Sequence, residues 1–185
     1  MRGFIEKLNI DFSKFSLTEN DFKIKSDIHG IGHVYRVMFN VLSLGSGLDD
    51  ILNTKISFCA AYIHDLSRRH DGHCEKHGYN SVDDNFGKFK ELFLSIGLNS
   101  VDLRGVSKSS IHHSIIKEID KGNEFYIPIS ILKDADGLDR VRLGNLDPKY
   151  LRFKESHKLI ERSERLFSDY KHYDSFKDFL YDNLD

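Results

Sequence analysis

The sequence predicts an all-α fold, a compact bundle of about six to eight helices. Apolar residues recur every three or four positions along most of the chain, as they do on one face of an α-helix, and strand-like alternation is scarce. The two prolines, Pro128 and Pro148, leave long segments in which helices can run without interruption. The 185 residues, of which 39% are hydrophobic, suit one domain with one sizeable core.

The first two predicted helices carry the clearest patterns. Between Ile28 and Leu44 the apolar residues follow the i, i+3, i+4, i+7 spacing of a helix with one buried face. The second helix is expected from Leu48 to Leu66. Its later part, ISFCAAYI, is apolar all round and therefore predicts a central, buried helix. Residues 67–78 are polar and predict a loop.

Two more helices are expected in the middle of the chain. Apolar residues from Val82 to Ile96 mark the third helix, and Gly97 is a suitable residue to end it. Ser100 is the expected N-cap of a fourth helix that runs to about Asp120.

The last third of the chain predicts three further helices. One covers about Ile129 to Arg142. The Asp147-Pro148 pair is typical of a helix start, with proline in the first helical position, and periodic residues extend that helix to Tyr170. A short final helix is expected between Phe176 and Leu184.

Charge and composition exclude several classes of protein. With 27 Lys and Arg against 29 Asp and Glu, the net charge is 27 − 29 = −2, so the chain lacks the attraction that nonspecific binding to a nucleic-acid duplex needs. The cysteines, Cys59 and Cys74, form no disulfide framework, and Cys59 is expected to be buried. The N-terminal MRGFIEKLNIDF has no long apolar region, and no segment approaches a membrane span. We therefore expect a cytoplasmic protein with no membrane partner.

Histidines are concentrated in the first two thirds of the chain, where eight of the ten lie between His29 and His113. On the first predicted helix, His29, His33, Arg36 and Asn40 are spaced four, three and four apart and would form one polar row. Such a row is commonly a solvated face, but solvated faces favour Lys and Glu, and this row has neither. A functional role is the better interpretation.

The His64-Asp65 pair ends the apolar second helix. Burial of a carboxylate costs free energy unless it is paired or bound to a cation, and a divalent metal ion would supply that compensation. The alternative is a salt bridge at the helix end, with Arg68 or Arg69 as the partner.

Further candidates follow downstream. Asp136 lies in the apolar part of LKDADGLDRVRL and shares a helix side with Asp139, whereas Asp134 suits a charged or capping position. The loop after His64-Asp65 offers His77, which a backbone turn could aim inward, and arginines whose guanidinium groups match phosphate oxygens. The adjacent His112 and His113 both have apolar neighbours. If both were ligands, more than one metal ion would be bound.

Together these residues resemble the HD superfamily of metal-dependent phosphohydrolases. The pattern of that family is a His, then a His-Asp pair, then a distant Asp, all on helices. The matching positions are His33 in HGIGHVYRV, His64-Asp65 in AAYIHDLSR and Asp136 in KDADGLDRV. The resemblance spans about residues 26–145. The GYP-type segment of the cyclic-dinucleotide phosphodiesterase branch is absent from the sequence.

The resemblance implies a single HD-like domain over residues 1–185, with its motif core at about 26–145 and C-terminal helices at about 148–184 packing on it. It implies a divalent transition metal (Mn, Fe, Co, Ni or Zn, with Mg as a further candidate), as one ion or two. The residue roles that we expect are metal binding by His33, His64, Asp65, Asp136, His77 and His112; phosphate binding by Arg36 and Arg68; proton handling by His29 or His113; and orientation of a ligand by Asp139.

The implied activity is hydrolysis of an ester or anhydride in a small phosphorylated substrate, with a nucleotide as the default of the family. Two alternatives stay open. Six His and Asp ligands would also suit an HD-fold di-iron oxygenase. A metal with closed coordination would instead make the chain a non-catalytic, metal-stabilised binding module. The exact substrate and the oligomeric state are not determined by the sequence.

Overall fold

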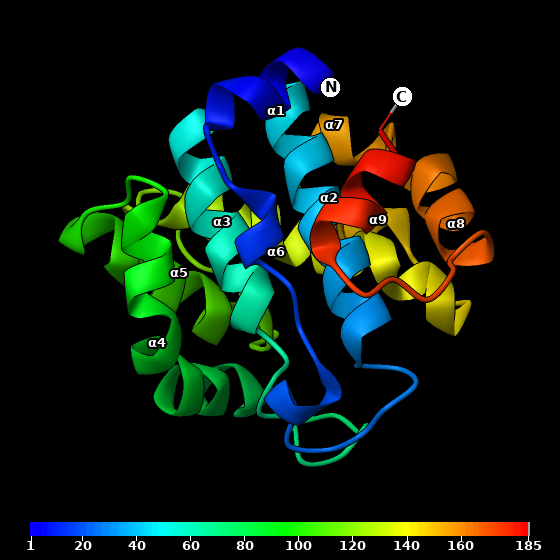
Figure 1. Ribbon diagram of the computed structural model, residues 1–185, viewed down its shortest axis with the longest axis horizontal. Coiled ribbons are helices and arrows are strands. Elements are labelled where there is room, and N and C mark those ends of the chain that lie inside the picture. Colours follow the sequence, from blue (N-terminus) through cyan, green and yellow to red (C-terminus); the bar gives the residue numbers. More distant parts are fainter. Residues whose placement is uncertain (185) are drawn as a thin grey trace.

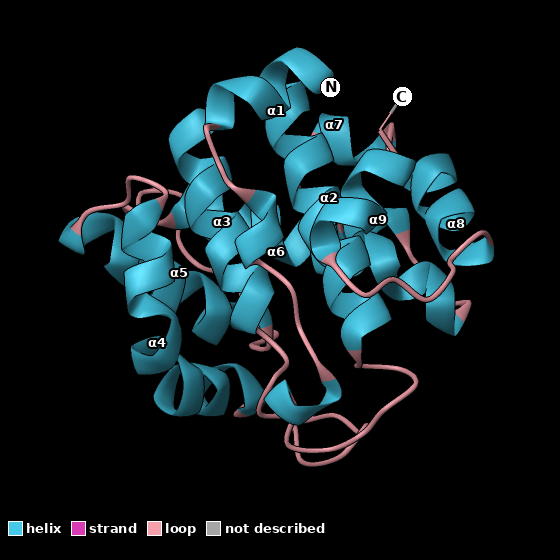
Figure 2. Ribbon diagram, viewed as in Figure 1, coloured by secondary structure: helices cyan, strands magenta, loops and turns pink. Residues whose placement is uncertain are grey.

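The computed structural model describes residues 1–184, and within them every regular element is a helix (Figure 1, Figure 2). The predicted all-α fold is confirmed. The α-helices are α1 (Arg2–Leu8), α2 (Ile31–Leu48), α3 (Ile51–Ile63), α4 (His77–Ser95), α5 (Ser100–His113), α6 (Tyr126–Leu138), α7 (Lys154–His157), α8 (Ile160–Ser168) and α9 (Phe176–Asp182). The short 3-10 helices are η1 (Phe12–Lys14), η2 (Glu19–Asp21), η3 (Asp139–Leu143) and η4 (Pro148–Tyr150).

Helix α3 is the centre of the fold. It packs against α2, α4, α5 and α6, and residues 56–63 are all buried, as the all-round apolar sequence predicts. Cys59 is among them and is fully buried. Where α2 crosses α3, Gly45 lies against Thr54 so closely that a Cβ on Gly45 would overlap the threonine side chain. This glycine therefore allows the two helices to approach at their shared end.

The ends of α2 and α3 differ from the predicted boundaries, and the difference places site residues in turns. Helix α2 begins at Ile31 rather than Ile28, because the Ser26 hydroxyl accepts from the backbone N–H of Ile28 and of His29 and holds them in a turn. Helix α3 ends at Ile63 rather than Leu66. His64 and Asp65 consequently lie at the end of the buried helix.

The predicted N-cap and the predicted C-terminal end of helix α5 are both wrong. Its N-cap is Asn99, not Ser100: the Asn99 side chain accepts from the backbone of Val101 and Asp102, and Asp102 accepts in return from Asn99. The helix ends at His113 instead of continuing to Asp120. The residues that follow are mostly exposed, so no packing surface extends the helix.

The predicted single helix from Asp147 to Tyr170 is wrong. The chain there forms η4, α7 and α8 in sequence. The cause is Asp134 on α6, which is fully buried and accepts from the backbone N–H of Arg152 (2.8 Å) and of Phe153 (3.0 Å). Its carboxylate also accepts from the Ser156 hydroxyl at 2.6 Å. Backbone groups bonded to a distant side chain are withdrawn from helical hydrogen bonding, so the helix is interrupted.

The two ends of the chain meet on one side of the bundle (Figure 1). The Phe176 ring on α9 packs against Phe12, Tyr35 and Phe58, with centroid separations of 5.5–6.0 Å. Helix α1, which the periodicity did not predict, packs on α2 and α3. These contacts place the C-terminal helices on the core. Across residues 1–184, no helix has both the length and the apolar character that crossing a membrane requires.

The structure predicts that Asp134→Asn lowers the free energy of unfolding by about 3 kcal/mol, because an amide cannot replace a buried carboxylate that is paired with Arg152. Urea denaturation measures the change. Asp147→Asn is the matched control: this side chain caps exposed η4, a role that asparagine also fills, so its effect should stay below about 0.5 kcal/mol. Equal denaturation midpoints for the two variants would contradict the structural role of Asp134.

Candidate metal centre

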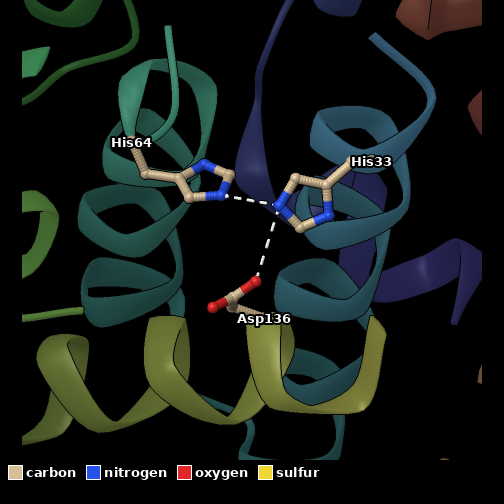
Figure 3. Close-up of side chains that lie close together, drawn as sticks. All are labelled: His33, His64 and Asp136. Carbon is tan, nitrogen blue, oxygen red and sulfur yellow. Dashed lines mark hydrogen bonds and ion pairs between the residues drawn. The ribbon is translucent and has the colours of Figure 1, made fainter. Parts of the chain in front are cut away.

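Three helices bring the four residues of the predicted motif together. His33 comes from α2, His64 and Asp65 from the end of α3, and Asp136 from α6. The His33 Nε2 atom lies 3.1 Å from the Nε2 of His64 and 3.5 Å from an oxygen of Asp136 (Figure 3). The same nitrogen lies 3.3 Å from Oδ2 of Asp65.

Asp65 separates this cluster from a second pair of histidines. Its Oδ2 faces the His33 and His64 rings, whereas its Oδ1 lies 3.1 Å from Nε2 of His77 and 3.6 Å from Nε2 of His113. The carboxylate is 2% exposed. One buried carboxylate therefore has imidazole nitrogens on both sides.

The second pair depends on the close approach of α4 and α5. The Nε2 atoms of His77 and His113 lie 2.7 Å apart. Directly after His77, Gly78 lies so close to the backbone oxygen of Ser110 that a Cβ would overlap it. Only glycine allows this approach, which brings the start of α4 and the end of α5 together.

In all four histidines the other ring nitrogen contacts an acceptor. Nδ1 of His33 lies 2.7 Å from the Asp139 carboxylate, and Nδ1 of His64 lies 2.7 Å from the Ala61 carbonyl. The two remaining Nδ1 atoms contact backbone carbonyls, that of Cys74 for His77 and that of Ser110 for His113. We assign the ring proton to Nδ1 in each case from these partners, which leaves a lone pair on each Nε2.

This donor set fits a metal ion. With the ring protons on Nδ1, the Nε2 lone pairs and the carboxylate oxygens are all electron donors, and they face one another. Two groups have their ligand atoms within 4.8 Å of one another: His33, His64 and Asp136, and His64, Asp65 and His113. These buried His and Asp groups could hold a metal ion, and mixed imidazole and carboxylate ligands suit divalent transition metals.

The pKa shifts describe the same environment. Burial, together with nearby His113 and His33, lowers the pKa of His64 to about 3, despite the opposing effect of Asp65. Burial also lowers the pKa of His77. The carboxyl of Asp136 has its pKa lowered to about 2: burial opposes the shift, but His33, Arg142 and His64 outweigh it. At neutral pH, His64 is thus neutral and Asp136 is ionised, as metal ligands must be.

The surroundings of the His33 ring favour a positive charge. Burial and Arg142 oppose its protonation, but hydrogen bonds with Asp139 and Asp65 outweigh them and raise the pKa of His33. The surrounding carboxylates therefore favour a positive charge at this ring. A cation at Nε2 would supply that charge with the imidazole neutral.

A cavity of about 600 Å³, here called the metal-side cavity, opens onto the cluster. Asp65, Asp136, His77 and His113 are part of its wall. Its other walls carry the cations Arg68, Lys133, Arg140, Arg142 and Arg152. Lys133 and Arg152 are paired with Glu118 in the same wall, so Arg68 and Arg140 are the cations best placed to attract an anionic substrate.

Arg68 is the cation of this wall that touches the cluster. It is 8% exposed, and its Nη1 lies 3.5 Å from Asp65 and 3.0 Å from His77, with Nη2 donating to the Gly72 carbonyl. Its Nε atom is buried without a hydrogen-bond partner. An unpaired buried donor next to the cluster is suited to an acceptor such as a phosphate oxygen.

Three predicted residues lie differently from expectation. His112 belongs to neither ligand group, because adjacent residues on a helix point about 100° apart and His113 faces Asp65. His113 is therefore a candidate ligand rather than a proton carrier. Arg36 was expected to bind phosphate, but its Nε and Nη2 bind Asp139 at 2.6 and 3.0 Å, and it does not line the metal-side cavity.

His29 also departs from the predicted helical row, because it lies in the turn before α2. Its Nδ1 contacts Asp71 at 2.9 Å, and both residues line the metal-side cavity. The sequence interpretation missed Asp71 and the cations at positions 133 and 140. Spacing alone could have indicated the latter two, since they lie three residues before and four residues after Asp136.

Comparisons with known proteins leave the family open. No family model matches the chain, no curated protein matches it, and no solved structure matches it. What the chain does must therefore be argued from its own residues.

The geometry predicts the tautomers of the site. With Zn²⁺ added, His33, His64, His77 and His113 should each carry the ring proton on Nδ1, because Nε2 binds the ion. Long-range nitrogen–proton NMR correlations measure this. His172, whose side chain is 79% exposed, is the control and should show the averaged tautomers of a solvated ring. A proton on Nε2 of His64 in the Zn²⁺-loaded protein would contradict the ligand assignment.

Proposed function

We propose that this chain is a metal-dependent phosphohydrolase of the HD superfamily that cleaves an ester or anhydride in a small phosphorylated substrate. One observation carries the proposal: the Asp65 carboxylate lies between two sets of imidazole Nε2 atoms at the wall of a cavity rimmed by arginines and lysine. Metal ligands and phosphate-binding cations thereby meet in one place.

For the proposal we divide the ligands into two groups, one on each side of Asp65, and His77 joins the second group because its Nε2 lies 3.1 Å from Asp65. His33, His64 and Asp136 would hold one ion, and His77 and His113 would hold a second on the other side of the carboxylate. When bound, such ions supply Lewis acidity toward the phosphate and lower the pKa of water so that it can act as a nucleophile near neutral pH.

The remaining residues of the cavity bind and orient the substrate. Arg68 lines the cavity next to Asp65, so its guanidinium group is the nearest cation to a phosphate bound there. Arg140 lines the same wall and would attract further negative charge on the substrate, whereas Lys133 is paired with Glu118. The cavity volume of about 600 Å³ is enough for a nucleotide-sized molecule, in keeping with the default substrate of the family.

His29 is the best-placed proton carrier. It lines the cavity, and the acceptance of its Nδ1 proton by Asp71 leaves Nε2 as a free acceptor. Burial lowers the pKa of His29 although Asp65 opposes this, so the ring is neutral at pH 7 and can take up a proton. Asp139 is a positioning residue. It bonds Nδ1 of His33 and fixes the orientation of that ring.

The first test is elemental analysis of the purified chain, followed by a screen for phosphate release from nucleotides and other phosphate esters with Mn²⁺, Fe²⁺, Co²⁺, Ni²⁺, Zn²⁺ and Mg²⁺. Asp136→Ala should abolish turnover and lower the metal content by the ion of the first group, because it removes a ligand and a charge from that group. Asp83→Ala, the loss of an exposed carboxylate on α4, is the control and should leave the metal content unchanged. Unaltered metal content in Asp136→Ala would remove Asp136 from the site.

The second test counts the ions. We expect two ions per chain, and His113→Ala should reduce the count to one, because His113 belongs only to the second group. The neighbouring His112→Ala is the control and should keep both ions, since His112 lies outside both groups. The measurement is metal content after dialysis. Two ions retained in His113→Ala would contradict the assignment of the second group.

The six His and Asp ligands of the two groups also support a di-iron oxygenase as a second candidate function. The two candidates differ in their need for oxygen. Phosphate release under strictly anaerobic conditions supports hydrolysis, whereas tightly bound iron with turnover only in air supports the oxygenase. A chain that binds metal but turns over nothing in either screen would be the non-catalytic binding module.

A further inference from the structure

A second cavity, of about 500 Å³, lies beside the metal-side cavity and is here called the Arg36 cavity. The two cavities share three wall residues, Ile28, Arg142 and Leu143. The Arg36 cavity reaches His33 and Arg36, but neither Asp65 nor Asp136 is part of its wall. Of the four motif residues, only His33 is part of its wall. The proposed function does not use this cavity.

Arg36 presents an unpaired donor at this cavity. Its side chain is only 6% exposed, and Nε and Nη2 are both bonded to Asp139. Within residues 1–184, the remaining terminal nitrogen, Nη1, has no hydrogen-bond partner. The guanidinium lies over the rings of Phe167 and Tyr170, at 5.3 and 5.2 Å from their centroids. The guanidinium group of Arg36 is thus held in place with its Nη1 donor unused. Unused arginine donors of this kind bind carboxylates and similar anions.

The charge at the inner end of the cavity favours the same kind of ligand. Arg36 and Arg142 both bind the single carboxylate of Asp139, so one positive charge of this trio is uncompensated. At the mouth, Lys25 and Glu19 pair with each other at 3.0 Å, and Asp27 is exposed. The excess positive charge therefore lies at the buried guanidinium groups of Arg36 and Arg142, for which Asp139 is the shared carboxylate.

The rest of the wall is apolar and partly aromatic. Phe22, Ile24, Ile31 and Tyr170 line it together with Ile28, Leu143 and Phe167. The last three are large apolar side chains that are 38–43% exposed. Apolar side chains left exposed around a cavity, rather than singly on the surface, are typical of a ligand site.

We propose that the Arg36 cavity binds a small organic anion with an aromatic body, whose carboxylate or sulfonate accepts from Arg36 while its rings pack against Phe167. Binding there requires neither metal nor phosphate chemistry, so the inference stands apart from the proposed function. A bound anion would also bear on the metal centre, because Asp139 joins Arg36 to Nδ1 of His33.

The test uses anilinonaphthalene sulfonate, an aromatic anion that fluoresces in apolar surroundings, titrated into the full chain with and without EDTA. We expect saturable binding of one dye that EDTA does not abolish. Phenylnaphthylamine, which has the same rings without the sulfonate, should bind about tenfold more weakly because it leaves Arg36 unpaired. Equal affinity of the two dyes, no saturable binding, or loss of binding with EDTA would each overturn the proposal.

Two aromatic truncations locate the dye. Phe167→Ala should weaken binding about tenfold, because it removes one wall of the Arg36 cavity. Tyr150→Ala removes an exposed aromatic ring from the metal-side cavity and should leave the affinity unchanged. Both side chains are largely exposed, so thermal melts should show folded proteins. Weakening by Tyr150→Ala with no effect of Phe167→Ala would place the dye in the wrong cavity and overturn the proposal.

Discussion

The buried carboxylate of Asp65 is the constraint on which the arrangement of the helices depends. It is enclosed by α2, α3, α4 and α5, and imidazole nitrogens lie on both of its sides. Removing an ionised carboxylate from water costs several kcal/mol unless opposite charge compensates it. Arg68, at 3.5 Å, supplies one cation to one side only. Further positive charge at the imidazoles, from protonation of His33 or from a cation, would complete the compensation.

The parts of the fold and site that the sequence predicted are those that depend on local periodicity. Helices α2 and α3 were predicted to within four residues at each end, because apolar spacing reports directly which side of a helix is buried. His33 was identified from the polar row beside the apolar face of its helix, and Asp136 because it lies within an apolar segment. The break at Arg152 was not predictable in this way, since Asp134, which causes it, lies 18 residues earlier in the chain.

The roles of His112, His113 and Arg36 were not predicted correctly for a different reason. Whether His112 or His113 faces the cluster depends on the rotation of α5 about its own axis. That rotation is set by the close contact between Gly78 and Ser110, which joins two separate helices. Likewise, Arg36 shares a helix side with His33, but its direction is decided by Asp139 and by the ring of Tyr170. The spacing of residues shows on which face of a helix a side chain lies, whereas tertiary packing decides which residues that side chain contacts.

Asp139 connects the His33 ring of the candidate metal centre to Arg36 of the neighbouring cavity. Its carboxylate accepts from Arg36 and Arg142 and also bonds Nδ1 of His33, and it is almost fully buried. Since the bond at Nδ1 sets the basicity of Nε2, the electron density that His33 offers a metal ion depends on how strongly the two arginines draw on the same oxygens. An anion that takes up part of the charge of Arg36 would leave more of Asp139 for His33. Through this one shared carboxylate, occupation of the Arg36 cavity would therefore change how strongly His33 could bind a metal ion.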